Sequence, residues 1–280
     1  MAHLLEGKPI AERLKEELKK EILNFDIKPV LASIQVLENP ACEVYIKSQK
    51  KTAESLGIDY RFYKLDSNIS ESKLIEFIQN LNLDNSIHGI ILQMPLPSHI
   101  DYKNISEYID PKKDVEGLNP KNLGKLIFGK AKILPCTPSA VMELLKETKV
   151  DLYGKEVVVV GHSEIVGKPL ALLLLEKFAT TTVCHIATSQ RSKLEEHVKQ
   201  AEILVVAVGK ANLIKGNWIK EGAIVIDVGI NKVGDKIVGD VELEEASKRA
   251  SWITPVPGGV GPLTTVMLMR NLLEATKLQI

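Results

Sequence analysis

Hydrophobic and polar positions alternate along the first half of the chain in two different periods. Apolar residues recur at helical spacing in three segments: residues 8–24, 41–56 and 71–82. Short apolar runs typical of strands occupy residues 29–37, 60–65 and 88–97. Gly57 stands where a helix C-cap is expected, and prolines stop the last of the three runs. Apolar strands separated by helices predict a mostly parallel sheet that is covered on both faces.

A second series of the same kind begins after the turn-rich residues 134–140. Residues 150–178 contain a strand, a turn with glycines and a helix. The series continues with a helix around 191–200 and with strands at 181–186, 201–209 and 222–230. We therefore predict an α/β protein with two domains, residues 1–138 and 139–263. The final helix, 264–280, is expected to pack back on the first domain.

Composition narrows the class of ligand. The chain has 280 residues, of which 45% are hydrophobic, and its 36 basic side chains balance its 36 acidic ones. Such a balance gives no net field to recruit nucleic acid or an anionic membrane, so we expect a small-molecule ligand. The three cysteines are widely spaced and form no C-x-x-C pair, which argues against a disulfide framework and a zinc site. With no signal-like start and no long apolar segment, a cytoplasmic protein without a metal is expected.

One glycine-containing turn indicates a nucleotide. Gly161 ends an apolar strand, and Gly167 lies six residues further on, at the start of a helix. In a dinucleotide fold this turn presents backbone N–H groups to a pyrophosphate. Ser163 occupies the position of the middle glycine in the usual fingerprint, so a plain strand-to-helix turn is the alternative. Gly209 and Gly229, which end two later strands, favour the nucleotide.

The ordered motifs ILQMPLP, DPKKDVEGLNP, PCTP, GHSEIVGKP, AIVIDVGIN and ITPVPGGVGPLT follow an N-terminal helix. With them, essentially the whole chain resembles the methylenetetrahydrofolate dehydrogenase/cyclohydrolase family. The resemblance implies two α/β domains with an interdomain cleft, the C-terminal one a Rossmann-type doubly wound parallel sheet. It also implies a homodimer, with folate bound mainly by residues 1–138 and NAD(P)+ by residues 139–263.

The resemblance assigns roles to individual residues. Tyr45, Gln49 and Gln93 occupy catalytic positions, and Tyr45 and Asp114 are implied to contact the folate. The alternatives are a half-buried core aromatic for Tyr45 and a turn-capping carboxylate for Asp114. The loop over folate and nicotinamide corresponds to Gly258, Gly259, Gly261 and Pro262. The implied cofactor-binding residues are Gly161, His162, Ser163, Ile165, Val166, Gly167, His185, Thr188, Gly209, Gly229 and Ile230.

Gln49 is the main departure from the family, which has its central cyclohydrolase lysine four residues after the tyrosine. On a helix Gln49 lies about 40° from Tyr45, whereas Lys50 and Lys47 lie about 140° and 160° away. A glutamine amide can position water, but it cannot exchange a proton near neutral pH. We therefore predict a methylenetetrahydrofolate dehydrogenase whose cyclohydrolase activity is weak or absent.

Other readings stay open. The chain could be an ordinary bifunctional enzyme, a folate or nucleotide binder without catalysis, or another Rossmann dehydrogenase. Cys42 replaces the family serine before the tyrosine, for which a redox-sensing role is the alternative. His162 replaces the family arginine, and the second strand of the nucleotide domain ends in His185 without a carboxylate or guanidinium. NAD or NADP remains the cofactor, and the missing arginine favours NAD+ over NADP+.

Overall fold

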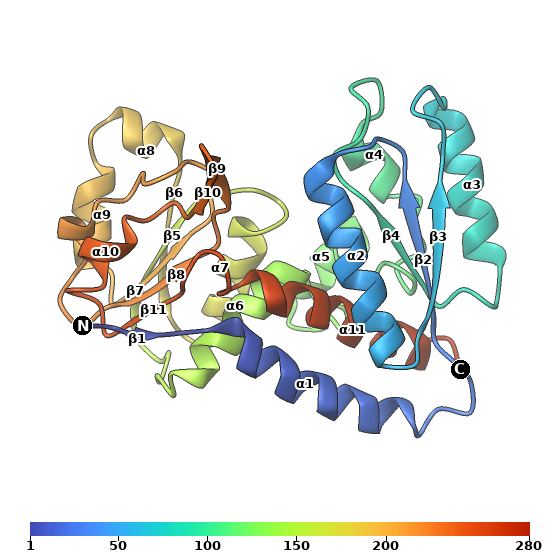
Figure 1. The fold of residues 1–280 in the computed structure, drawn as a ribbon, viewed down its shortest axis with the longest axis horizontal. Helices are drawn as coiled ribbons and strands as arrows, with labels where there is room; N and C mark the ends of the chain where they lie inside the picture. Colours follow the sequence, from blue (N-terminus) through green and yellow to red (C-terminus); the bar gives the residue numbers. More distant parts are fainter. The chain divides into compact units, whose positions relative to one another are not determined.

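The computed structural model describes residues 1–280, except for the side chain of Ala41. It contains two compact units, each discontinuous in sequence (Figure 1). The six-stranded unit comprises Met1–Glu12 and Thr137–Thr264, and the three-stranded unit comprises Arg13–Cys136 and Thr265–Ile280. The three unit boundaries fall within helix α1, Gly7–Ile22, at the start of helix α6, Cys136–Glu147, and near the start of helix α11, Gly261–Lys277.

The six-stranded unit is built around an entirely parallel sheet with the strand order β1-β11-β8-β7-β5-β6. Its strands are β1 His3–Leu4, β5 Glu156–Val160, β6 Thr180–Cys184, β7 Ile203–Val206, β8 Ile224–Asp227 and β11 Trp252–Ile253. Its helices are α6 Cys136–Glu147, α7 Gly167–Leu175, α8 Ile186–Gln190, α9 Leu194–Gln200, α10 Leu243–Ala246 and the 3-10 helix η1 Gly216–Trp218. An antiparallel hairpin joins β9, Asn231–Val233, to β10, Lys236–Val238.

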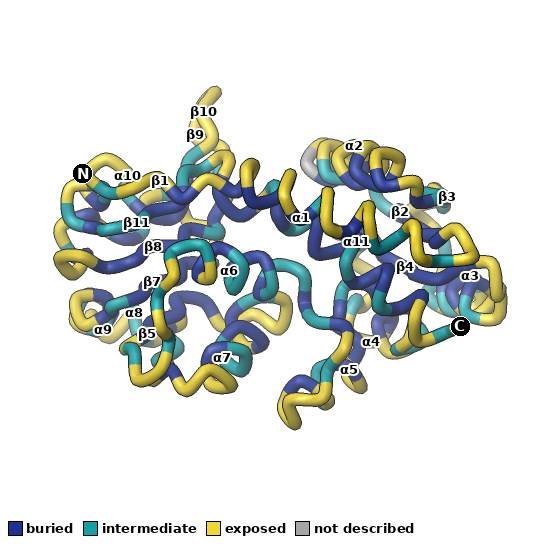
Figure 2. Tube along the Cα trace, turned by 90° about the horizontal axis from the view of Figure 1, so that it is seen from below, coloured by how far each residue is buried: buried dark blue, intermediate teal, exposed yellow. Residues whose placement is uncertain are grey.

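Burial explains the sequence of the central strands. Every residue of β7 and β8 is buried, as are the last four of β5, and these segments are dark in Figure 2. Both faces of such strands are covered, so their sequences are continuous apolar runs instead of alternating ones. The chain moves from β5 to β6 on one side and then crosses to β7 on the other. The edge between β5 and β7 is therefore the topological switch point of the sheet.

The three-stranded unit has the parallel order β3-β2-β4. Its strands are β2 Val30–Gln35, β3 Asp59–Lys64 and β4 Gly89–Leu92. Its helices, besides most of α1 and α11, are α2 Pro40–Ser55, α3 Glu71–Leu83, α4 Tyr102–Ser106 and α5 Pro120–Ile127. The central strand β2 is buried along its full length. Ser33 and Gln35 are thus polar side chains inside the core, and each requires a hydrogen-bond partner there.

Several predicted bounds need correction. Residues 1–12 were expected in the first domain, but they belong to the six-stranded unit because β1 extends its sheet beside β11. The strand predicted at 88–97 ends at Leu92, and the helix predicted around 191–200 starts at Leu194, with α8 before it. The hairpin β9–β10 and the two-residue strands were not predicted. No described helix is long and apolar enough to span a membrane.

Candidate functional sites

Gln49 lies at the centre of a buried amide network in the three-stranded unit. Helix α2 turns Gln49 inward, where it has 0% exposure, and leaves Lys47 and Lys50 in solvent, as predicted from the helical spacing. The Gln93 amide nitrogen donates to Gln49 Oε1 at 2.8 Å, and the Gln49 amide nitrogen donates back to Gln93 Oε1 at 3.4 Å. The two amides therefore satisfy each other in a site without bulk water.

Strand residues complete this network. Gln93 directly follows β4, and its amide nitrogen also donates to Ser33 Oγ on β2 at 3.0 Å. The Tyr60 hydroxyl, on β3, donates to Gln49 Oε1 at 2.9 Å. Cys42 contacts the same group, with its Sγ 3.9 Å from Gln93 Oε1. Tyr45 lies four residues before Gln49 on α2 and is half-buried.

The titratable members of the network hold their protons at neutral pH. Burial raises the pKa of Tyr60 to about 12 and raises the pKa of the Cys42 thiol above its ordinary value. Glutamine and serine side chains do not titrate in this range. The described side chains that hydrogen-bond to Gln49 and Gln93 therefore include no group that exchanges a proton with substrate near pH 7.

Asp114 is held by its own loop. Its carboxylate accepts hydrogen bonds from the backbone N–H groups of Gly117 and Asn119, at 3.1 and 2.8 Å. It also accepts one from the side-chain amide of Asn122 at 2.9 Å. Desolvation raises the pKa of Asp114 despite these donors. This arrangement matches the alternative considered above, in which Asp114 caps a turn.

Glu116, two residues later, is the carboxylate that the sequence reasoning missed. It is half-buried, and desolvation of its carboxyl group, together with the nearby Asp114 charge, raises its pKa to about 8. Burial also raises the pKa values of its neighbours Tyr102 and Cys136. Asn271, on α11, fixes the loop by donating to the carbonyl oxygens of Val115 and Leu134 at 2.8 and 2.7 Å. A strongly perturbed carboxyl group on a fixed loop is typical of a ligand site.

A pocket of about 430 Å³ lies at the carboxyl edge of the six-stranded sheet, at the switch point between β5 and β7. Four predicted cofactor-binding residues line it: Gly161, His162, Ser163 and His185. Ile186, Ser189, Val208 and Lys210 also line it and were not among the predicted residues. Ligands of open parallel sheets bind at this position.

Two glycines shape the turn beside this pocket. Gly161 has φ +123°, and a Cβ atom there would lie 2.3 Å from the carbonyl oxygen of Ala207. A Cβ atom on Gly167 would lie 2.0 Å from the carbonyl oxygen of Gly161. Only glycine fits at either position, and the resulting tight turn leads into the N-terminus of α7. This geometry fits the pyrophosphate of a dinucleotide.

The remaining predicted cofactor residues do not line the pocket. Val166 precedes α7, Ile165 and Ile230 are exposed, and Thr188 Oγ1 accepts from the His185 N–H at 3.2 Å.

Buried Asp240 accepts from the N–H groups of Val208, Gly209 and Lys210 at 2.7–2.9 Å. Asp227 accepts from the Gly229 N–H at 2.9 Å, and burial raises its pKa to about 6. These two carboxylates, which sequence reasoning did not select, fix the loops that carry Gly209 and Gly229.

The predicted glycine-proline loop belongs to the six-stranded unit. Gly258 has φ +110°, and Gly261 and Pro262 begin α11. The Gly7 N–H donates to the Gly258 carbonyl oxygen at 2.9 Å. A Cβ atom on Gly7 would lie 1.8 Å from the carbonyl oxygen of Gly259. The N-terminal segment therefore packs backbone against backbone with this loop.

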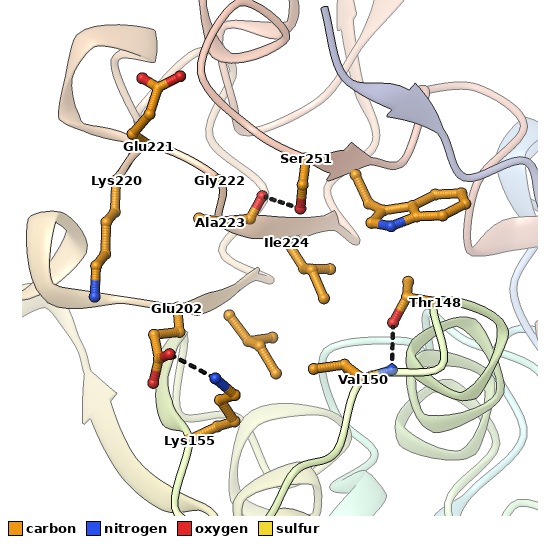
Figure 3. Close-up of a pocket in the computed structure, with 12 residues that line it drawn as sticks. Thr148, Val150, Lys155, Glu202, Lys220, Glu221, Gly222, Ala223, Ile224 and Ser251 are labelled. Atoms are coloured by element: carbon orange, nitrogen blue, oxygen red, sulfur yellow. Dashed lines mark hydrogen bonds and ion pairs between the residues drawn. The ribbon is translucent and has the colours of Figure 1, made fainter.

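A second pocket, of about 330 Å³, lies at the amino edge of the same sheet (Figure 3). It is lined by residues next to the starts of β5, β7, β8 and β11, Trp252 among them. Lys155 Nζ pairs with Glu202 Oε1 at 2.8 Å at its edge, and this pair lowers the pKa of Glu202. None of the predicted site residues lines this pocket. The carboxyl-edge pocket is therefore the candidate nucleotide site.

The six-stranded unit thus has the fold and turn of a dinucleotide-binding domain, and the three-stranded unit presents a buried polar cluster. Two family models match the chain: "Tetrahydrofolate dehydrogenase/cyclohydrolase, catalytic domain" at residues 5–116 and "Tetrahydrofolate dehydrogenase/cyclohydrolase, NAD(P)-binding domain" at residues 135–280. The chain belongs to the tetrahydrofolate dehydrogenase/cyclohydrolase family.

Individual relatives are similar over their full length. The bifunctional protein FolD of Acetivibrio thermocellus is 52% identical over 99% of this chain and 98% of its own. The crystal structure of FolD from Campylobacter jejuni, 46% identical, covers 100% of both chains with a TM-score of 0.96. The Trypanosoma brucei enzyme, solved with NADP and an inhibitor, is 38% identical with a TM-score of 0.94 and covers 99% of this chain and 97% of its own.

Proposed function

We propose that this chain is an NAD(P)-dependent methylenetetrahydrofolate dehydrogenase with little or no cyclohydrolase activity. Its relatives, named as bifunctional dehydrogenase/cyclohydrolases, support the folate substrate and the dehydrogenase reaction. In that reaction a hydride leaves the methylene carbon of the substrate, and a methenyl cation is formed. The bound nicotinamide supplies the hydride acceptor.

The observation that carries the proposal is the fully buried, neutral Gln49. Ring opening of the methenyl cation requires a water molecule to lose a proton as it attacks. The described partners of Gln49 are Gln93 and Tyr60, and neither accepts a proton near pH 7. Hydride transfer requires no proton exchange at this position. The neutral network is therefore compatible with the first reaction and poorly suited to the second.

Glu116, and not Asp114, is the carboxylate that we assign to the substrate. Asp114 uses both of its oxygens to accept hydrogen bonds from its own loop. A pterin ring presents adjacent N–H donors that a carboxylate can accept side by side. Desolvation and the Asp114 charge raise the pKa of Glu116 with no hydrogen-bond donor to offset them, and the N–H donors of a pterin would supply that compensation.

For the cofactor we propose a preference for NAD+ at neutral to alkaline pH. The residues at the ends of β5 and β6, His162 and His185, replace the guanidinium that would hold a 2′-phosphate. A titration in which NADP+ binds at least ten times more tightly than NAD+ at pH 8 would contradict this preference. A homodimer is proposed on the family resemblance alone, and light scattering of the purified protein tests it.

Two assays on one purified sample test the function. The first follows methenyltetrahydrofolate formation from methylenetetrahydrofolate with NAD+ and with NADP+. The second follows the decay of added methenyltetrahydrofolate against the uncatalysed rate. We expect hydride transfer without accelerated decay. Accelerated decay would identify an ordinary bifunctional enzyme, and nucleotide binding without hydride transfer would identify a non-catalytic binder.

A further inference from the structure

Two histidines face each other where the adenosine end of a dinucleotide is expected. His162 lies one residue after Gly161, which follows β5, and His185 directly follows β6. The two strands pair with Val160 beside Cys184, and the Gly161 N–H donates to the Cys184 carbonyl oxygen at 2.9 Å. The imidazole rings are consequently 5.2 Å apart and nearly edge to face. Both side chains are exposed and both line the carboxyl-edge pocket.

This position decides which cofactor a doubly wound fold accepts. A carboxylate at the end of the second strand binds the ribose hydroxyls of NAD+, and a fixed cation binds the 2′-phosphate of NADP+. A histidine side chain is neither a carboxylate nor a permanent cation, because its ordinary pKa of about 6.5 lets its charge change between pH 5 and 8. Two adjacent imidazoles at this position therefore offer neither a permanent anion nor a permanent cation to the cofactor.

We propose that His162 and His185 form a proton-controlled subsite for the 2′-phosphate, so that falling pH shifts cofactor choice from NAD+ towards NADP+. The neutral pair hydrogen-bonds a ribose hydroxyl. The protonated pair donates two charge-assisted hydrogen bonds to a phosphate. The phosphate also offsets the repulsion between two imidazolium rings, so binding of NADP+ takes up protons. This inference rests on the proposed use of a dinucleotide, but it concerns binding and not hydride transfer.

Other charged groups of this region come from three segments. Glu164, in the turn after β5, also lines the pocket, and its carboxylate forms an ion pair with Lys168 at 2.9 Å. Lys210, after β7, lines the pocket as well. Arg191 follows α8 and is exposed. These side chains are unchanged in the variants that test the pair, so a change in pH dependence reports on the two histidines.

Isothermal titration calorimetry of the full-length protein with NAD+ and with NADP+, at pH 6.5, 7.2 and 8.0 and constant ionic strength, tests the inference. We expect the ratio of the NADP+ to the NAD+ dissociation constant to fall about tenfold from pH 8.0 to pH 6.5. In the double variant His162→Gln/His185→Gln the ratio should stay constant with pH. His162→Arg should favour NADP+ at every pH.

His197→Gln, on α9 of the same unit, is the matched control and should keep the pH dependence of the wild type. A wild-type ratio that changes less than twofold, or a pH dependence that survives in the double variant, would overturn the inference. Binding of neither nucleotide would overturn it together with the proposed function. If the ratio of dissociation constants changes with pH as expected but the protein transfers no hydride, the proposed subsite stands and only the dehydrogenase assignment is removed.

Discussion

At the scale of single residues, we expect the side chain at position 49 to decide whether the protein catalyses hydride transfer alone or hydride transfer followed by hydrolysis. Gln49→Lys places an ionisable group in the buried network, where desolvation lowers a lysine pKa towards neutrality. We expect methenyltetrahydrofolate hydrolysis to accelerate by roughly 10²-fold or more over the wild type, as is typical of general acid–base catalysis. The decay of methenyltetrahydrofolate absorbance measures this gain.

Ser48→Lys is the matched control, because it adds the same charge at the exposed neighbouring position of α2. It should not accelerate hydrolysis. If Gln49→Lys folds, as circular dichroism would show, and still fails to hydrolyse the substrate faster than the wild type, residue 49 does not limit the second reaction.

Glu116→Gln tests the carboxylate that the structure adds to the site. Loss of charge-assisted hydrogen bonds to the pterin should raise the KM for methylenetetrahydrofolate by roughly tenfold or more. Because the carboxylate form accepts the N–H donors, the wild-type KM should fall as pH rises through about 8. Steady-state kinetics of both proteins from pH 6.5 to 9 measure these effects.

The same substitution should stabilise the empty protein at high pH. The folded-state pKa of Glu116, about 8, lies above its ordinary value of 4.5, so the native state binds the proton more tightly than the unfolded state. Stability is then lost as pH rises between these values. Glu116→Gln should therefore exceed the wild type in Tm by more at pH 8.5 than at pH 5. Glu107→Gln, an exposed carboxylate in the same unit, should show no such difference, and equal shifts in both variants would contradict the assignment.

At the scale of elements, the junction of β5 with α7 depends on the close backbone contact between Gly161 and Gly167. Gly167→Ala introduces a methyl group 2.0 Å from the Gly161 carbonyl oxygen, so the turn must open. We expect NAD+ affinity to fall at least about tenfold and Tm to drop, since overpacking of this kind costs roughly 1–3 kcal/mol. Calorimetry and thermal melting measure the two effects.

Gly124→Ala is the contrasting substitution, because Gly124 lies inside α5 and an added Cβ atom meets nothing within 4 Å. It should stabilise the protein by roughly 0.5–1 kcal/mol through helix propensity. NAD+ binding that persists in Gly167→Ala would show that the tight turn is not needed for the nucleotide.

Elements with strong local patterns could be predicted from the sequence, and those fixed by distant contacts could not. The period of α2 placed Gln49 inside and the lysines outside, because burial follows helical spacing directly. Asp114 and Glu116 are two residues apart in one loop, and only the positions of Gly117, Asn119 and Asn122 show which of the two is already satisfied.

Other contacts could not be predicted because the residues that make them lie far apart in the sequence. Asp240 holds the loop at residues 208–210 from 30 to 32 residues away, and no local period signals that contact. Tyr60 reaches Gln49 only because β3 passes beside α2. The two-residue strands β1 and β11 are too short to produce an alternating pattern at all.

At the scale of the whole molecule, the first residues stabilise a sheet whose other strands lie more than 150 residues later. The N–H groups of His3 and Leu5 donate to the carbonyl oxygens of Ser251 and Ile253, both at 2.8 Å, and Leu5 is 2% exposed. Deleting residues 2–5 should cost roughly 2–4 kcal/mol, from one buried leucine and its neighbouring hydrogen bonds. Thermal or denaturant unfolding measures the loss.

Hydrogen exchange shows which part of the protein loses stability when residues 2–5 are deleted. Amides of β11 should exchange faster in the truncated protein, and those of β2 in the three-stranded unit should be little affected. Uniformly faster exchange in both units would mean that the deletion weakens the whole chain at once, contrary to the grouping of residues 1–12 with the six-stranded unit.

The pairing of β1 with β11 also has a consequence for synthesis. His3 emerges from a ribosome long before its partner Trp252 exists, so the edge of this sheet cannot close cotranslationally until β11 has been made. The three-stranded unit likewise waits for α11, the last helix of the chain. Each nascent unit therefore exposes apolar surface while translation continues, and we expect the growing chain to be a client of ribosome-associated chaperones even though the finished protein is a small two-unit enzyme.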